Sequence, residues 1–482
     1  MKKNIIIAAI AAASALLLSV SCQKENQPES QNGINGGANT FTATIEQSLT
    51  KTILNGNKVE WADGDKISIN GKIYTASPKD GAATKADFTP EDEEATAEGG
   101  KFKAFFPSSL YEAADRFVLP DTLNIASDNF NVPMYAETES SSQTLSFKNI
   151  CAVLKINVTE ADIAAIKSIK VKADKPLSGE FTISPEGDKA VMDNNGSNEV
   201  VLSFETVQTL TSSAKSFYIA IPAQEYSYLK IYLSDDGTLY KRAMITKKAE
   251  GLGTISVNTI YEINYETNAV QLYADGPYWS TMNLGATTVA GSGETCYGDY
   301  YAWGETQPYY ATKTWNDADK KWVFDPWKEG KESGYAWQSY CGQSSFSEWP
   351  TKPFDDTSKN LTGAFDAATV NWGDAWKMPT GGNNGQFKAL QAHTISAWAA
   401  DYDGVAGRKV SGKDDYSDIE LFIPIAGEAV NDHTNNTLGF YWSSSMNTYQ
   451  SEGLFMYVNS GEFQPVFNGN RFRGLSVRPV AD

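Results

Sequence analysis

The chain has 482 residues, which at about 150 residues per domain predicts about three domains, each long enough to bury a core. Its 59 acidic residues outnumber its 40 basic residues, and the formal net charge of -19 leaves no positive face to neutralise the phosphates of nucleic acid. Only two histidines occur and the four cysteines show no C-x-x-C spacing, which argues against a histidine-based catalytic site or a zinc site. We therefore expect no metal, no cofactor, no nucleic-acid partner and no enzyme.

The N-terminus indicates export. Residues 1–21 begin with two lysines and continue with an apolar run over residues 5–18 that is too short to span a bilayer, which is typical of a secretory signal peptide. Cys22 follows the small residue Ser21, and this arrangement resembles a lipobox, in which the thiol is acylated before cleavage. The alternative is a plain signal peptide beside an incidental cysteine. We expect a palmitate-carrying lipoprotein attached through Cys22 to the outer membrane at the cell surface.

Residues 22–40 form a polar stretch in which Ile34 is the one large aliphatic residue. Such a segment cannot bury enough apolar surface to fold, so we interpret it as a flexible tether between the lipid and the folded body. No later segment is long and apolar enough to predict a membrane-spanning helix.

Short alternating segments dominate the next part of the chain, which predicts many half-buried β-strands. The first is Phe41–Ile45, and Lys66–Thr75 predicts a hairpin because Asn70-Gly71 favours the positive φ angles of a tight turn. Further strands are expected at Val153–Val158, Phe217–Ile221, Tyr228–Leu233 and Leu239–Ile245, and the best helix candidate is Glu160–Ile166. Trp61 and Cys151 are expected in the core. This pattern predicts β-sandwiches.

Six short motifs in this region occur in an order and spacing that resemble the fimbrillin-like proteins of gut and oral anaerobes. The motifs are Lys51-Thr52, Val59–Trp61, Gly64–Ile67, Phe102–Pro107, Leu145–Leu154 and Leu177–Gly179. The resemblance implies two transthyretin-like β-sandwich domains, over residues 41–141 and 142–266. It also implies a pilus system in which a protease removes a first strand and a strand of another subunit fills the groove.

Two features of the chain depart from that family. Its maturation cut commonly follows an arginine, but the first arginine after Cys22 is Arg116. The chain also continues for roughly 200 residues after the second predicted sandwich, which fits a tip or accessory subunit better than a repeating shaft subunit.

Residues 267–482 differ in composition, because eleven of the twelve tryptophans lie beyond Tyr273. Phe387, Leu390 and Thr394 share one face of a predicted helix, and residues 364–368 predict a further turn or two. Elsewhere short strands alternate with long loops rich in glycine, serine and asparagine. The segment therefore predicts a loop-rich α+β domain.

Seven motifs occur in order here and resemble the Fibrobacter major paralogous domain family. They are Trp279–Ala286, Tyr297–Glu305, Ala367–Gly373, Trp376–Thr380, Phe422–Gly427, Gly439–Ser445 and Gly474–Pro479. The resemblance covers nearly all of residues 267–482 and implies a C-type-lectin-like fold. The expected fold class of the whole chain is thus mainly β with α+β: two sandwiches followed by one lectin-like domain.

Aromatic residues are the first candidates for ligand contact. The motif tryptophans are expected in the core: Trp303, Trp372, Trp376 and Trp442. The tryptophans of the insertion between residues 309 and 349 lie outside the motifs, and their density suggests an exposed contact surface: Trp315, Trp322, Trp327, Trp337 and Trp349. The alternative for this second set is a small satellite core.

Other candidate groups carry weaker signals. Cys296 and Cys341 lie in exported, loop-rich sequence and form the one disulfide we consider, the alternative being two separate thiols. Trp315-Asn316-Asp317 matches a calcium-binding triplet of some lectins but lies in the insertion, where we expect coincidence. Several carboxylates fall near motifs, and solvated surface groups are the ordinary explanation: Glu305, Asp366, Asp374 and Glu428.

Taken together, these features predict a surface lipoprotein that acts as a pilus tip or accessory subunit. Its partners would be other pilus subunits, joined by strand addition, and a host or bacterial glycan or protein contacted by the lectin-like domain. The alternative is a non-polymerising surface lipoprotein that captures glycan or protein ligands.

Overall fold

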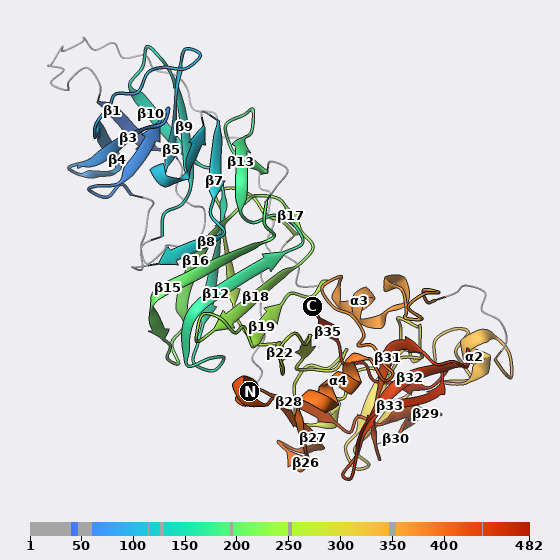
Figure 1. Cartoon of the computed structure of the whole chain (residues 1–482). Coiled ribbons are helices and arrows are strands. Elements are labelled where there is room, and N and C mark those ends of the chain that lie inside the picture. The colour runs from blue at the N-terminus through green and yellow to red at the C-terminus, as the bar shows by residue number, and fades with distance from the viewer. Residues whose placement is uncertain are drawn as a thin grey trace, which may run out of the picture.

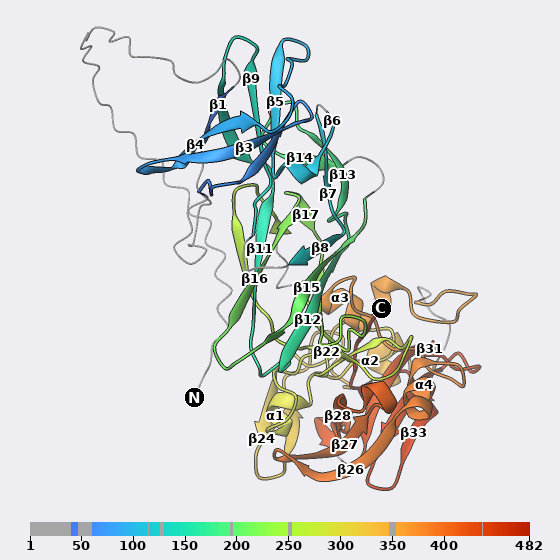
Figure 2. The same ribbon diagram turned by 60° about the vertical axis from the view of Figure 1, so that its left-hand side comes forward.

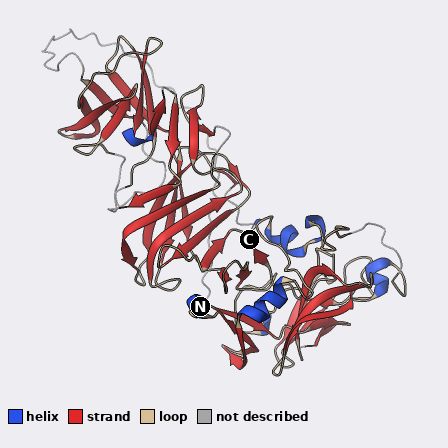
Figure 3. Cartoon of the chain, in the orientation of Figure 1, coloured by secondary structure: helices blue, strands red, loops and turns tan. Residues whose placement is uncertain are grey.

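Strands dominate the computed structural model of the chain, and its helices are short (Figure 1, Figure 3). The structure describes residues 40–46, 60–113, 115–125, 130–192, 196–248, 253–346, 353–435 and 437–482. The predicted mainly β fold class is confirmed. Among the described residues, no helix is both long and apolar enough to cross a membrane.

The first sheet closes into a seven-stranded barrel at one end of the molecule (Figure 1). Its strands, in spatial order, are β1 (Phe41–Ile45), β10 (Thr144–Asn149), β9 (Met134–Glu139), β5 (Lys101–Phe106), β2 (Lys66–Ile69), β3 (Lys72–Lys79) and β4 (Ala82–Pro90). The predicted β2–β3 hairpin is confirmed, with φ angles of 43° at Asn70 and 81° at Gly71. Trp61 is 4% exposed and lies in the barrel core, as expected.

The middle of the chain forms a β-sandwich, because one hydrophobic cluster draws side chains from two facing sheets. The smaller sheet has the order β16 (Lys215–Ile221), β11 (Ala152–Val158) and β21 (Ile260–Asn264). The larger sheet contains β8 (Thr122–Ile125), β15 (Glu199–Thr209), β12 (Ala165–Ala173), β18 (Leu229–Ser234) and β19 (Arg242–Ile245). Smaller sheets add β6 (Tyr111–Ala113), β7 (Arg116–Leu119), β13 (Gly179–Ile183) and β14 (Ala190–Met192), and β17 (Glu225–Tyr226) with β20 (Gly253–Thr254).

Two sequence predictions fail in this region. The boundary between residues 141 and 142 does not separate the sheets, because β10 lies after it yet pairs with β1, whereas β8 lies before it and pairs with β15. The helix expected at Glu160–Ile166 is absent, because residues 160–162 form a turn and Ala165 already begins β12. Ile166 is a buried residue of β12, so its apolar side chain packs in the core of the sandwich.

The larger sheet continues into the C-terminal region. β22 (Ala269–Gln271) pairs with β19, and β23 (Tyr278–Ser280) and β35 (Val480–Ala481) extend the sheet to eight strands. The predicted boundary at residue 267 therefore falls inside a sheet. Lys241 and Arg242 add ion pairs to Asp418, at 2.8 and 3.0 Å.

Among the described residues of the C-terminal region, three more sheets and four short α-helices complete the fold (Figure 2). The first sheet has the order β24 (Lys313–Asn316), β25 (Lys321–Phe324), β30 (His433–Asn435), β29 (Glu428–Val430) and β34 (Gly474–Leu475). The second consists of β26 (Ile395–Tyr402), β27 (Val405–Ser411) and β28 (Glu420–Pro424). The third consists of β31 (Gly439–Met446), β32 (Glu452–Val458) and β33 (Phe463–Asn470). The helices are α1 (Gly293–Cys296), α2 (Trp337–Cys341), α3 (Ala367–Trp372) and α4 (Gln386–His393). Helix α4 confirms its prediction, with Phe387 and Leu390 buried.

Candidate functional site

Several predicted site residues lie outside the described residues. They are the lipid-attachment candidate Cys22, the signal peptide at residues 1–21, the tether up to residue 39, and Trp349. Their assignments stay predictions.

Strand β1 is the first candidate site, because it is a five-residue strand that completes the barrel. Its backbone pairs with β10 in parallel and with β4 in antiparallel fashion, so both of its edges are occupied. Phe41, Ala43 and Ile45 point into the barrel and are 2%, 0% and 7% exposed. Because alternate side chains fill the core and both backbone edges are paired, β1 occupies a slot with the recognition pattern of strand addition.

The interior end of this slot is aromatic. The ring of Phe41 meets those of Tyr74 and Phe102 edge-on, with centroid distances of 5.5 Å and 4.9 Å. On the outer face, the Thr42 hydroxyl donates a hydrogen bond to Asp87 at 2.7 Å. Edge-to-face ring pairs depend on geometry, so they favour a strand that presents an aromatic residue at this position.

Four of the five insertion tryptophans pack into one aromatic cluster. Trp322 is 6% exposed, and Trp315, Trp327 and Trp337 pack partly buried against the same aromatic cluster. The rings of Trp315 and Trp322 meet edge-on with their centroids 5.4 Å apart, and the ring centroids of Trp337 and Phe472 lie 4.8 Å apart. For these four residues the packing favours the satellite core over the exposed contact surface, because a loop this rich in large rings covers much of its own apolar area.

The motif tryptophans are in the core, as expected. Their exposed fractions are 0% for Trp303, 8% for Trp372, 0% for Trp376 and 0% for Trp442. The indole N–H of Trp303 donates to the carbonyl of Ser443 at 2.8 Å, which ties the loop after α1 to β31.

The predicted disulfide is not formed: Cys296 and Cys341 are both free thiols. Cys296 is buried, and burial raises the pKa of its thiol to about 12. The Cys341 sulfur lies 3.4 Å from the carbonyl oxygen of Trp337, one turn earlier in α2. Cys151 is also free, and complete burial raises its thiol pKa to about 12, which fits the expected inert core cysteine.

Three of the four carboxylates near the motifs have structural partners. Asp366 caps α3, and burial raises its pKa although the amides of Met378, Thr369 and Ala368 donate to it. Glu428 pairs with Arg473, Glu305 accepts from Lys331 at 3.2 Å, and Asp374 is exposed.

The polar side chains of the lectin-like triplet have partners within the chain. Asn316 caps the turn that follows it by accepting from the amides of Ala318 and Asp319, and Asp317 pairs with Lys320. In the part of the chain that the structure describes, no three histidine, cysteine, aspartate or glutamate side chains gather as metal ligands.

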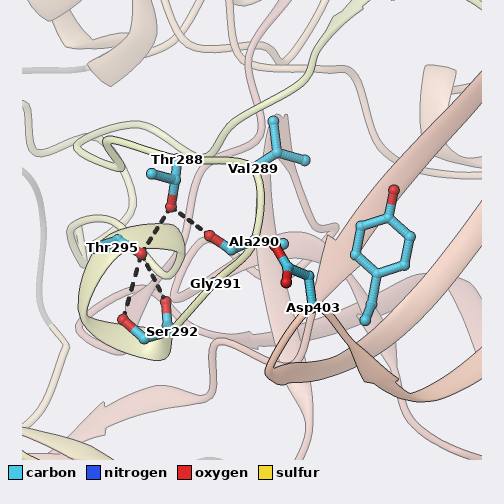
Figure 4. A pocket seen from close by; sticks show the side chains of 8 residues that line it. Thr288, Val289, Ala290, Gly291, Ser292, Thr295 and Asp403 are labelled. Carbon is cyan, nitrogen blue, oxygen red and sulfur yellow. Dashed lines mark hydrogen bonds between the residues drawn. The ribbon is translucent and has the colours of Figure 1, made fainter. Parts of the chain in front are cut away.

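A second candidate site is an open concavity in the C-terminal region (Figure 4). It is lined by Thr288, Val289, Ala290, Gly291, Ser292, Thr295, Tyr402 and Asp403. One wall is the loop that leads from β23 into α1, and the other is the turn between β26 and β27. Figure 4 shows the hydroxyls of Thr288, Ser292 and Thr295 gathered together, with Asp403 on the other side.

Sequence reasoning missed this concavity because its walls lie more than a hundred residues apart and match no motif. Buried arginines were missed as well. Arg478 is 1% exposed and donates to the carbonyls of Ser280 and Phe422, each at 3.1 Å. Its place in the last motif was the one available signal.

No protein-family model matches the chain, and no curated protein matches it. Among solved structures, it is similar to a candidate cell adhesion protein of Bacteroides uniformis, at 14% identity and a TM-score of 0.29, covering 48% of this chain and 93% of that one. A candidate cell adhesion protein of Bacteroides ovatus gives 13% identity, a TM-score of 0.29 and coverages of 47% and 91%. The tip fimbrial protein Mfa3 of Porphyromonas gingivalis is similar at 10% identity and a TM-score of 0.20, and the match covers 47% of this chain and 95% of that one. At these TM-scores the likeness is too low to decide fold or function.

Proposed function

We propose that the chain is a surface lipoprotein, anchored through Cys22, that serves as a tip or accessory subunit of a fimbria. In this proposal residues 41–266 form two transthyretin-like domains that join other pilus subunits. Residues 267–482 are a C-type-lectin-like domain that makes the adhesive contact. The proposed activity is binding, not catalysis.

The observation that carries the proposal is the way β1 is held in the barrel. This strand covers only residues 41–45, yet it closes the barrel on both sides and buries three side chains. Removal of so short a strand would expose two strand edges and an apolar slot, which is the state that a strand of another subunit can fill.

The connection between the middle and C-terminal regions supports the adhesive part. An adhesive domain transmits force from its ligand to its anchor, and here the two regions share one hydrogen-bonded sheet through β19 and β22. One hydrophobic cluster also spans the junction, with Tyr232 and Ile245 on one side and Trp376 on the other. This junction resists bending far better than a flexible linker would.

The alternative is a lipoprotein that binds ligands without joining a pilus, and one observation favours it. Arg116, the first arginine after Cys22, begins β7, which pairs with β13. A cut after this residue would detach everything before β7 rather than release β1 alone. An arginine-specific protease therefore cannot open the slot in the manner of the family.

The test is strand exchange in the full chain. A specific protease site is placed between residues 46 and 60, the protein is cut, and a labelled peptide of residues 40–46 is added in excess. A control peptide of the same composition exchanges the apolar and polar positions, which turns the apolar side chains to the outer face. We expect the first peptide, and not the control, to enter the barrel in native mass spectrometry.

Two outcomes separate the candidates. Exchange in vitro, together with immunogold label for residues 270–482 at the distal ends of filaments, supports the pilus role. Equal uptake of both peptides, or label scattered over the cell surface with no filament marked, contradicts it and leaves the ligand-capturing lipoprotein.

A further inference from the structure

The concavity between the β23–α1 loop and the β26–β27 turn is preorganised by backbone contact. The amide of Gly291 donates to the carbonyl of Asp403 at 2.9 Å. Gly404 has a φ of 90°, and a Cβ at this position would lie 2.4 Å from the carbonyl oxygen of Gly291. The two walls therefore touch through glycines and hold their spacing without side chains between them.

Aromatic packing fixes the residues around the concavity. The ring of Tyr402 stacks on that of Phe422 at 4.2 Å with an interplanar angle of 12°, and Phe422 is 1% exposed. On the opposite wall, Gly293 begins α1 directly against the indole of Trp315, where a Cβ would lie 2.3 Å from the ring. A ligand would therefore meet a surface that already has its bound shape.

The polar groups of the concavity are mainly hydrogen-bond acceptors toward solvent. The Thr288 hydroxyl lies 2.6 Å from the carbonyl oxygen of Ala290 and 2.7 Å from the Thr295 hydroxyl, which in turn lies 3.2 Å from the carbonyl oxygen of Ser292. The Thr288 hydroxyl donates its one proton to these acceptors and keeps its lone pairs for a ligand, whereas the Thr295 hydroxyl already accepts from Thr288. The exposed carboxylate of Asp403 accepts hydrogen bonds only.

The lining also excludes several classes of ligand. It contains no lysine or arginine, and its one charged group is the Asp403 carboxylate, so an anion would be repelled. One carboxylate is far short of the six to eight oxygens that calcium takes. The matching ligand is neutral, rich in O–H donors, and able to lay C–H groups on Val289, which is 38% exposed, and on Tyr402.

We propose that this concavity binds one neutral sugar residue of a host or bacterial glycan, with Asp403 and Thr288 accepting from its hydroxyls and Val289 contacting its C–H face. The inference deepens the proposed adhesive function and rests on it. Because the site is open, we expect a single sugar to bind weakly, and adhesion then needs several copies acting together.

The test uses the full mature chain and methyl glycosides of glucose, galactose, mannose, fucose and N-acetylglucosamine, titrated by saturation-transfer NMR. Asp403→Asn is expected to weaken binding of the best ligand roughly 5- to 10-fold, because the neutral amide oxygen is a weaker acceptor than the carboxylate. Thr288→Val removes one acceptor and is the second variant. Glu294→Gln is the matched control: it removes one exposed negative charge from α1, outside the lining, and should change affinity less than twofold.

Each result decides the proposal. Binding that falls in Asp403→Asn and Thr288→Val but not in Glu294→Gln supports it. It is overturned if none of the five glycosides binds, or if the three variants bind alike.

A separate adhesion assay distinguishes failure of this sugar site from failure of the proposed function. If the wild-type chain and Asp403→Asn adhere equally to glycan-coated beads, the adhesive function stands and this site is wrong. If sugars bind here but immunogold label never reaches filaments, the site stands and the pilus role is wrong.

Discussion

Replacing Phe41 by alanine tests whether β1 is held in the barrel by its apolar side chains. Phe41 is 2% exposed, and its ring meets Tyr74 and Phe102 in edge-to-face pairs. Neighbouring Thr44 lies on the other face of the same strand, half-buried, and its backbone pairs with Lys85 and Ser146. Thr44→Ala is therefore the matched control.

The expected magnitude follows from the packing. Burying a phenylalanine side chain contributes roughly 1.5–3 kcal/mol, and a cavity left by truncation raises the total loss for a Phe→Ala change to about 3–5 kcal/mol. The barrel loses two ring pairs of about 0.5–1.5 kcal/mol each within that total. Because β1 is short and can open locally, we expect about 3–4 kcal/mol to appear as easier detachment of the strand.

Hydrogen exchange of the β1 amides measures this opening directly. A loss of about 3–4 kcal/mol corresponds to exchange roughly 150- to 1,000-fold faster in Phe41→Ala, since about 1.4 kcal/mol is a factor of ten. Thr44→Ala should change exchange less than threefold. If both variants exchange alike, backbone pairing rather than the aromatic slot holds β1, and the argument for side-chain-specific strand addition fails.

Three further predictions concern the rest of the chain. Asp366→Ala should lower the free energy of unfolding by about 2–4 kcal/mol in a urea titration, because three backbone amides lose their acceptor, whereas exposed Asp374→Ala should change it by less than about 0.5 kcal/mol. Burial opposes ionisation of Asp236, but amide and hydroxyl donors outweigh it and lower its pKa to about 2. The stability this carboxylate contributes should be present above about pH 4 and lost as the pH falls through 2, and an NMR titration that finds an ordinary midpoint would contradict the turn geometry. Iodoacetamide should label half-buried Cys341 in the native protein and Cys151 only after denaturation, and equal labelling would mean that the core opens readily.

Local patterns were predictable where one residue type controls the backbone or one face is buried. Phe41–Ile45 was expected as a strand and forms β1, because its alternation matches the two faces of a barrel wall. The Asn70-Gly71 turn and helix α4 were expected for similarly local reasons. Glu160–Ile166 failed because a short apolar spacing fits both a helix and a turn followed by a strand, and pairing of β12 with β18 decided it.

The candidate sites were also predictable from the sequence only in part. The sequence indicated the strand that closes the barrel. It left five tryptophans open between an exposed surface and a satellite core, and four of them pack into the aromatic cluster of the insertion. Composition shows how much apolar area a loop carries, but not whether the loop covers it. The pairing of Cys296 with Cys341 failed for a related reason, because the distance between two loops depends on the whole fold.

What the sequence alone determined is the mainly β class, the tight turns, the strand β1 and the change in composition near residue 273. These depend on alternation and on residues with special backbone preferences. Only the tertiary structure decided that β10 returns to the first barrel, that β22 joins the middle sheet, and that the Thr288 loop meets Asp403. The physical reason is that strand partners and loop contacts are chosen by the burial of whole surfaces across hundreds of residues, and no local pattern encodes that choice.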